Sequence, residues 1–293
     1  MTDSLSHVSK SISVVRRTIG GQLGVAPFSS IVVANLGDFP GASAVTQATG
    51  WLVDGAGARG NVASASFGLF PPPPPSAPDT SANCAHGRDL GELMRDYVSA
   101  HFYHLSVAGA GNYNYGNCVL NRLNNGVVVG GAQNDATFSP YGSFQNPYVG
   151  QSEFPHLVAL SSDVSTPFGA YAGTSAATPQ VAGAAARIMS KIKVDTGSLP
   201  LPHAVRAILM ASATTLSNEV PFRVGIGNDY KQGTGLLHVN SAEILATARR
   251  LTPTTASSPG PASGHTEGIW NSLTSAKNTW IPRGAGSNIK IVL

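Results

Sequence analysis

The stretch PFGAYAGTSAATPQVAGAAARIM, residues 167–189, decides the fold of this chain. It places a single serine, Ser175, between a Gly-Thr pair and a run of small residues that begins a helix. In open α/β sheets, reactive groups gather where strands end and helices begin, because a helix N-terminus offers unpaired N–H donors and a positive potential. Ser175 therefore lies where a nucleophile is expected.

The segments around this stretch predict an α/β fold. Helical and extended patterns predict helices over residues 6–21, 42–57, 87–102, 201–214 and 242–250, and strands over 29–36, 61–70, 103–112, 126–132 and 156–162. Helices that alternate with short apolar strands indicate a parallel sheet covered on both faces.

Two of the helices carry distinct apolar stripes. The stripe on the helix after Ser175 consists of Val181, Ala185, Ile188 and Ile192. The stripe on helix 87–102 consists of Leu90, Leu93, Met94 and Tyr97. Alanine and glycine occupy nearly every other side of the helix after Ser175, so it is expected to pack in the interior.

Length and composition limit the function classes. The chain has 293 residues, 42% of them hydrophobic and only 11% charged, which indicates a compact globular protein. Its net charge of +3 is scattered without a basic run, so a nucleic-acid partner is not expected. Neither a membrane span nor a signal peptide is recognisable. Cys84 and Cys118 form either a disulfide or two buried thiols.

The chain divides into a folded part and an extension. Residues 1–250 are predicted to form the catalytic domain, 251–264 a Pro/Ser/Gly-rich linker, and 265–293 an extension that ends in a strand. The run Pro71 to Pro75 marks a surface loop, because proline cannot continue a strand ladder.

The nucleophile stretch resembles a known family. GTSAATPQVAG, residues 173–183, is similar to the nucleophile motif of the subtilisin-like serine proteases, the subtilases of family S8. Further similar segments are GGQLGVAPFSSIVV at 20–33 and GTGLLHVNSAEIL at 233–245, so the resemblance covers residues 3–250. It implies a three-layer subtilisin-like α/β fold, mostly parallel, in which Ser175 attacks the scissile carbonyl.

Two more segments carry the resemblance to the substrate site. SVAGAGN, residues 106–112, implies that the Asn112 amide donates to the oxyanion, a contact that lowers the barrier by about 3–4 kcal/mol in a relative. SASFGL, residues 64–69, implies that an extended peptide pairs with the chain. The residues expected to contact substrate are Ser66, Phe67, Gly68, Gly109 and Ala110.

The family pattern makes His7 the candidate general base. It lies seventeen residues before Gly24, which begins the Gly-Val-Ala-Pro turn of the family. Val8 and Ser9 stand where the family has Gly-Thr, so a helix-capping role for His7 is the alternative. Surface or structural roles are expected for the other histidines considered, His86, His101, His104, His156, His203 and His238.

The carboxylate of the triad has no clear candidate. In the family the order along the chain is Asp, His, Ser, but only six residues precede His7. Asp3 and Asp163 resemble ordinary loop acids. NTWIPRGAGSNIKIVL, residues 278–293, resembles the family segment that normally runs into the catalytic Asp. The chain is therefore interpreted either as permuted or truncated, or as ending in an ordinary apolar tail.

Three functions stay open on these residues. The first is a serine endopeptidase, monomeric and acting on polypeptides, with no cofactor and no metal site identified, although the family resemblance allows structural calcium. The second is a peptide-binding pseudoprotease, because loss of the orienting Asp lowers turnover roughly 10⁴-fold in serine proteases. The third is an esterase. The resemblance also implies secretion.

Overall fold

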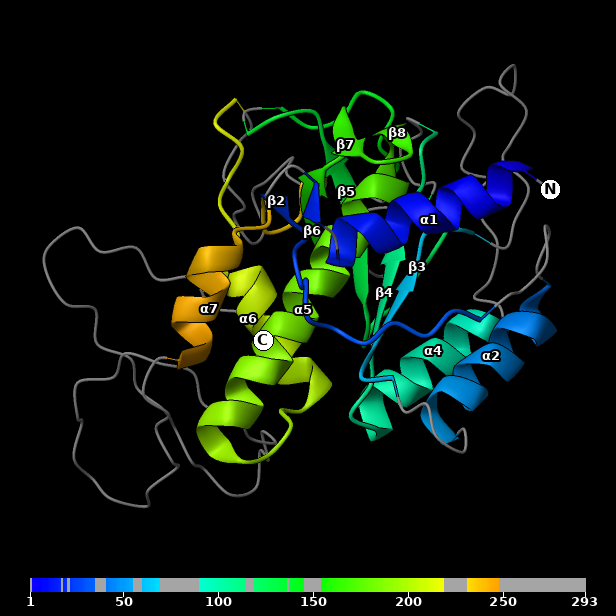
Figure 1. Ribbon diagram of the computed structural model, residues 1–293, viewed down its shortest axis with the longest axis vertical. Helices are drawn as coiled ribbons and strands as arrows, with labels where there is room; N and C mark the ends of the chain where they lie inside the picture. Colours follow the sequence, from blue (N-terminus) through cyan, green and yellow to red (C-terminus); the bar gives the residue numbers. More distant parts are fainter. Residues whose placement is uncertain are drawn as a thin grey trace, which may run out of the picture.

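The computed structural model describes residues 2–16, 18–19, 22–34, 41–54, 60–68, 90–113, 119–135, 137–144, 154–218 and 231–247 (Figure 1). The predicted linker and C-terminal extension, the proline run, Cys84 and Cys118 all lie outside these residues.

A parallel sheet forms the middle layer. Its strands are β3 (Val62–Ala65), β4 (Leu105–Gly109), β5 (Val127–Ala132) and β6 (Leu157–Leu160), hydrogen-bonded in that order. All three pairings are parallel. β4 and β5 are buried along their whole length, as expected for strands with both faces covered. A strand is confirmed within each of the predicted ranges 61–70, 103–112, 126–132 and 156–162, and residues 69–70 lie outside the described part.

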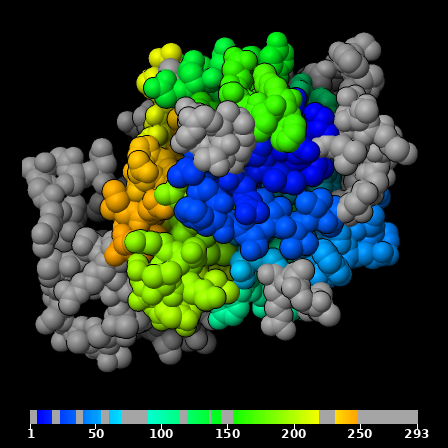
Figure 2. Space-filling view, in the orientation of Figure 1, coloured from blue at the N-terminus to red at the C-terminus, as the bar shows by residue number. Residues whose placement is uncertain are grey.

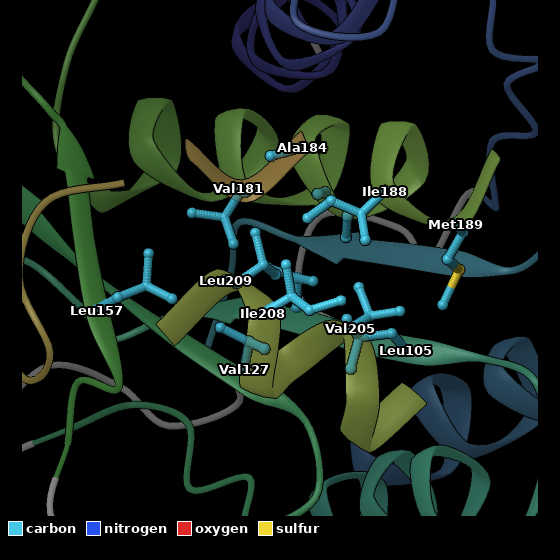
Figure 3. Close-up of a cluster of buried hydrophobic side chains, with 14 of the residues drawn as sticks. Leu105, Val127, Leu157, Val181, Ala184, Ile188, Met189, Val205, Ile208 and Leu209 are labelled. Atoms are coloured by element: carbon cyan, nitrogen blue, oxygen red, sulfur yellow. The ribbon is translucent and has the colours of Figure 1, made fainter. Parts of the chain in front are cut away.

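Helix α5 (Thr174–Thr196) lies across one face of the sheet. Its predicted apolar stripe is confirmed, since the Val181, Ala185, Ile188 and Ile192 side chains are at most 1% exposed. The stripe packs against inward-facing residues of β4, β5 and β6, among them Leu105, Val127 and Leu157 (Figure 3). Helices α6 (Pro202–Ser212) and α7 (Val239–Thr247), both predicted as helices, complete this main core.

Helix α4 (Leu90–His101) covers the opposite face, and α2 (Ala42–Asp54) packs on α4. The Ser106 hydroxyl donates to the Arg95 carbonyl, which ties β4 to α4. A smaller apolar cluster on this face includes Ala108, Val128 and Phe154. The predicted three-layer α/β architecture is therefore confirmed.

The apolar stripe of helix 87–102 is not the buried face of α4. Leu90, Leu93 and Tyr97 are 59%, 47% and 51% exposed, whereas Glu92 and Asp96 are buried. The Asp96 carboxylate accepts the backbone N–H groups of Asn124, Asn125 and Gly126, and Glu92 accepts that of Arg122. These carboxylates satisfy the backbone of the loop that leads into β5. Hydrogen bonding therefore outweighs apolar periodicity in orienting α4.

The strand predicted over 29–36 is wrong for its described part. Residues 29–34 adopt no regular structure, and Val32 and Val33 are 45% and 51% exposed. Within the described ranges, β3 is the last strand of its sheet and pairs with β4 alone. Without a neighbouring ladder, the backbone groups of residues 29–34 gain nothing from an extended strand.

The N-terminal segment covers the outside of α5. Helix α1 (Thr2–Arg16) crosses in front of α5, and the segment after it covers the middle of this face (Figures 1 and 2). Val14 is the buried apolar anchor of α1 and contacts Tyr171 and Ala176, whereas Val8 is 38% exposed. Two short antiparallel hairpins complete the described chain: β1 (Thr18–Ile19) with β2 (Gln22–Leu23), and β7 (Val164–Thr166) with β8 (Gly169–Tyr171).

The turn at residues 24–27 approaches α5 closely at Gly183. A Cβ atom on Gly183 would lie 2.9 Å from the Val25 Cβ. We expect Gly183→Ala to lower the free energy of unfolding by about 1–3 kcal/mol, because the turn must shift. Gly50→Ala in α2 is the matched control: its nearest neighbour is the Met94 Cε at 3.9 Å, and a gain of about 0.5–1 kcal/mol is expected. Urea unfolding measures both; equal effects would contradict the close-contact argument.

A buried histidine couples stability to pH. The His156 Nδ1 accepts the Val128 N–H at 2.9 Å, and an Arg206 guanidinium nitrogen lies 3.1 Å from its Nε2. Burial, and then the positive charge of Arg206, hold the pKa of His156 well below 6.5. Below pH 6.5 the unfolded chain consequently binds a proton that the folded chain does not.

We therefore expect the free energy of unfolding to fall as the pH decreases below about 6.5, by up to about 1.4 kcal/mol per pH unit from His156. Above about pH 6.5 His156 is neutral in both the folded and the unfolded chain, and its titration no longer lowers the free energy of unfolding. Urea unfolding at about pH 5 to 8 measures the slope. His156→Gln keeps an oxygen that can accept the Val128 N–H but does not titrate, so its slope should be shallower; an unchanged slope would contradict the assignment.

Candidate active site

Ser175 lies at a strand-to-helix junction, as predicted. It is the second residue of α5, and Gly173 caps this helix after β8. Gly173 has φ 79°, a conformation that favours glycine. A Cβ atom there would also lie 2.7 Å from the Asn112 Nδ2. The glycine before Thr174 is thus required both by the turn and by the neighbouring amide.

The Asn112 amide is oriented by the start of α5. Asn112 follows β4 through Gly111, and its Oδ1 accepts the Thr174 backbone N–H at 2.7 Å. The Thr174 hydroxyl in turn accepts the Gly111 N–H at 3.2 Å. Because the Oδ1 already accepts the Thr174 N–H, the Nδ2 of the same amide is left to donate. The Asn112 side chain is exposed. This geometry holds an amide donor beside the half-buried Ser175.

The residues after β3 contact the nucleophile. The Ser175 hydroxyl donates to the Ser66 carbonyl at 3.4 Å, and the Ser66 hydroxyl donates to the Ser175 carbonyl at 3.1 Å. The Phe67 side chain packs against the smaller core cluster, and a Cβ on Gly68 would lie 2.7 Å from the Leu120 Cβ. The backbone at Ser66 therefore lies directly beside Ser175.

Gly109 and Ala110 do not offer side-chain surface to a groove. Both are buried, and Ala110 is 0% exposed. A Cβ on Gly109 would lie 3.0 Å from the Thr178 hydroxyl oxygen. These two residues instead permit the close packing of β4 under the first turn of α5, which differs from the groove position expected for them.

His7 lies in the middle of α1, so it does not cap this helix. Its Nε2 is 3.2 Å from the Tyr171 hydroxyl, and the two rings meet edge to face with centroids 5.3 Å apart. Burial, and then the positive charge of Lys10, lower the pKa of His7 below 6.5. His7 is therefore neutral at pH 7 and able to accept a proton.

Tyr171 is the contact of the predicted base within the nucleophile stretch. Its hydroxyl lies 3.2 Å from the His7 Nε2 and 2.7 Å from the Ser11 hydroxyl. Burial raises the pKa of Tyr171, so the phenol stays protonated at neutral pH. The sequence argument assigned no role to Tyr171. Its position four residues before Ser175, inside the nucleophile stretch, was the available signal.

No carboxylate forms an ion pair with His7 among the residues that the structure describes. Asp163 is exposed in the turn before β7, with φ 53°, which confirms it as a loop residue. The Asp3 side chain lies outside the described part, so its predicted loop character is not seen, and its backbone belongs to α1.

The other histidines are explained without catalysis where they are described. His104 and His156 are buried structural residues, and the His101 and His238 rings bond to backbone groups of their own helices. His203 is exposed in α6, and His86 lies outside the described residues. In the described ranges, no group of three or more His, Cys, Asp or Glu side chains could hold a metal ion, and no helix is long and apolar enough to cross a bilayer.

Comparison with solved structures finds the same architecture in two proteases and a macrocyclase. The self-cleaved protease domain of PatA has a TM-score of 0.60 at 20% identity, over 80% of this chain and 81% of that chain. The prenylagaramide maturation protease PagA has a TM-score of 0.57 at 21% identity, over 81% and 82%. The PatG macrocyclase in complex with peptide has a TM-score of 0.55 at 17% identity, over 83% and 68%.

Sequence comparisons give the family. No curated protein sequence matches the chain. A model of the subtilase family, peptidase S8, matches residues 6–227, which is most of the chain. With the strand-to-helix serine and the parallel sheet already described, this match means that the chain belongs to the subtilase family of serine proteases.

Proposed function

We propose that this protein is a serine endopeptidase in which Ser175 is the nucleophile and His7 the general base. The Asn112 Nδ2 and the Ser175 backbone N–H would together bind the oxyanion. The observation that carries the proposal is the 2.7 Å bond from the Thr174 N–H to the Asn112 Oδ1. This bond fixes the amide so that its donor is available beside the nucleophile.

The chemistry follows from these positions. The Ser175 Oγ bonds to the scissile carbonyl carbon, and its proton ends on the neutral His7. The carbonyl oxygen becomes an oxyanion that is stabilised by donors already in place, so little reorganisation is needed in the transition state. His7 then returns the proton to the leaving amine, and water hydrolyses the acyl-enzyme by the same route.

The substrate class is an extended polypeptide. Ser66, Phe67 and Gly68 follow β3 in the chain, and the Ser66 carbonyl accepts the Ser175 hydroxyl. A peptide laid along this segment would bring its carbonyl to the nucleophile by strand addition. Secretion, a monomeric state and the absence of a cofactor stay predictions.

The second candidate is a peptide-binding pseudoprotease. It is favoured by the lack of a carboxylate ion pair with His7 among the described residues, and by Val8 and Ser9 in place of the family Gly-Thr. Without an orienting carboxylate, the imidazolium that forms during attack is less stabilised. Such a chain would keep the peptide segment and bind without efficient hydrolysis.

A serine-directed phosphonofluoridate separates the two candidates. Labelling of Ser175, located by peptide mass spectrometry, together with cleavage of a denatured protein substrate, would support the endopeptidase. A folded chain that binds peptide but leaves Ser175 unlabelled would support the pseudoprotease. Hydrolysis of short esters without any peptide cleavage would instead indicate an esterase.

A further inference from the structure

We propose that Asn121 is a positioning residue, whose side-chain amide holds the peptide segment, residues 66–68, against the chain that leads to the oxyanion donor. The inference rests on the proposed function and adds to it the group that fixes the substrate segment. Asn121 acts through the Phe67 and Gly109 carbonyls and not on the reacting atoms.

The Asn121 amide joins the ends of two neighbouring strands. Its Nδ2 donates to the Phe67 carbonyl at 2.9 Å and to the Gly109 carbonyl at 2.7 Å. The last pair of the β3–β4 ladder is Ala65 with Ala108, so both carbonyls lie just beyond the ladder. These two bonds, the Asn121 bridge, therefore connect the two chains where their backbone pairing ends.

A third partner fixes the orientation of this amide. The Asn121 Oδ1 accepts an N–H of the Arg95 guanidinium at 2.9 Å, and the Arg95 Nε donates to the Gly91 carbonyl within α4. A flipped amide would turn its oxygen to two carbonyls and its NH₂ group to a guanidinium, so no favourable contact would remain. The Asn121 and Arg95 side chains are only 1% and 3% exposed, so a replacement that cannot bond here carries a desolvation cost.

The two connected chains carry two parts of the proposed site. On one chain, the Ser66 carbonyl directly before Phe67 accepts the Ser175 hydroxyl. On the other chain, Asn112 follows Gly109 by three residues and carries the proposed oxyanion donor. The Asn121 bridge therefore sets the separation between the peptide segment and that donor. A bound peptide can present one carbonyl to both nucleophile and donor only while this separation is held.

Asn121→Asp tests the bridge, because it keeps the size of the side chain and can still accept from Arg95. At neutral pH its carboxylate has no proton to donate and repels the Phe67 and Gly109 carbonyls, so the peptide segment should shift away from β4. We expect KM for a fluorogenic peptide to rise and kcat/KM to fall by about 10²-fold. The rate of Ser175 labelling by a phosphonofluoridate should stay close to wild type, because so small a reagent does not use the peptide segment.

Ser106→Ala is the matched control. The Ser106 hydroxyl is 1% exposed and donates to the Arg95 carbonyl at 3.3 Å, so its loss weakens the same contact between β4 and α4 without removing the Asn121 bridge. Peptide hydrolysis and Ser175 labelling should both stay close to wild type. Asn121→Ser is a second test, because it loses both carbonyl bonds without adding a charge. Thermal unfolding checks the fold of each variant.

The split between the two rates separates positioning from a general role in stability. A folded Asn121 variant with wild-type KM and kcat, or one that loses Ser175 labelling in parallel with peptide hydrolysis, would overturn the proposal. Failure of both Asn121 variants to fold, with Ser106→Ala folded, would assign Asn121 to the fold alone and would also overturn it.

The proposed function can fail separately. A folded wild-type chain in which Ser175 is not labelled would overturn the endopeptidase. The affinity of the same peptide, measured by fluorescence anisotropy, would then still test the Asn121 bridge. Weaker binding by Asn121→Asp than by Ser106→Ala would support it, and equal binding would overturn it.

Discussion

Ser175→Ala is expected to abolish peptide hydrolysis, with kcat reduced by at least about 10⁴-fold, because only the oxyanion donors and substrate binding would remain. The alanine loses a single long bond, from the Ser175 Oγ to the Ser66 carbonyl. The free energy of unfolding should therefore change by less than about 0.5 kcal/mol. Hydrolysis of a fluorogenic peptide and urea unfolding measure the two effects.

Ser165→Ala is the control for this experiment. Ser165 is an exposed serine of β7, and its replacement should alter neither activity nor stability. If Ser175→Ala kept peptide hydrolysis within tenfold of the wild-type rate, another residue would have to be the nucleophile. The endopeptidase mechanism proposed above would then fail.

Asn112→Asp is expected to lower kcat by about 10²–10³-fold while leaving the fold intact. The carboxylate can still accept the Thr174 N–H, and a negative charge is favourable at the N-terminus of α5. It offers no donor to the oxyanion and also repels it. Activity should consequently fall without a loss of stability.

Asn112→Ala provides the matched comparison. It removes the acceptor of the Thr174 N–H as well as the donor, so we expect a similar loss of kcat together with a destabilisation of about 1 kcal/mol. Steady-state kinetics and urea unfolding on both variants test this difference. If Asn112→Asp retained wild-type kcat, the Asn112 amide would not stabilise the transition state.

The family and the central sheet could be predicted from local patterns in the sequence. The motif around Ser175 contains a glycine that must adopt a positive φ, strand 127–132 is a continuous apolar run, and strand 105–109 is apolar except for Ser106. Such features depend on a few neighbouring residues, so they can be predicted from a short stretch of sequence. The position of Asn112 after a buried strand was readable for the same reason.

The orientation of α4 and the irregular conformation of residues 29–34 could not be predicted from the sequence. Apolar periodicity placed Leu90 and Leu93 in one stripe, yet α4 turns its carboxylates inward to bind backbone N–H groups about 30 residues away in the chain. Residues 29–34 have strand-like composition, but a strand needs a partner ladder. Both outcomes depend on contacts between distant segments, which no local window contains.

The same distinction applies to the candidate site. The linear order of residues was enough to identify the subtilase motif, the helix that begins at Thr174 and the amide of Asn112, because short-range turn and helix geometry governs each of them. The arrangement of His7, Tyr171 and Ser175 arises only when α1 folds across α5 and brings together side chains 164 residues apart. Packing of that kind is set by the whole core, and it is what brings the Tyr171 phenol to the His7 imidazole.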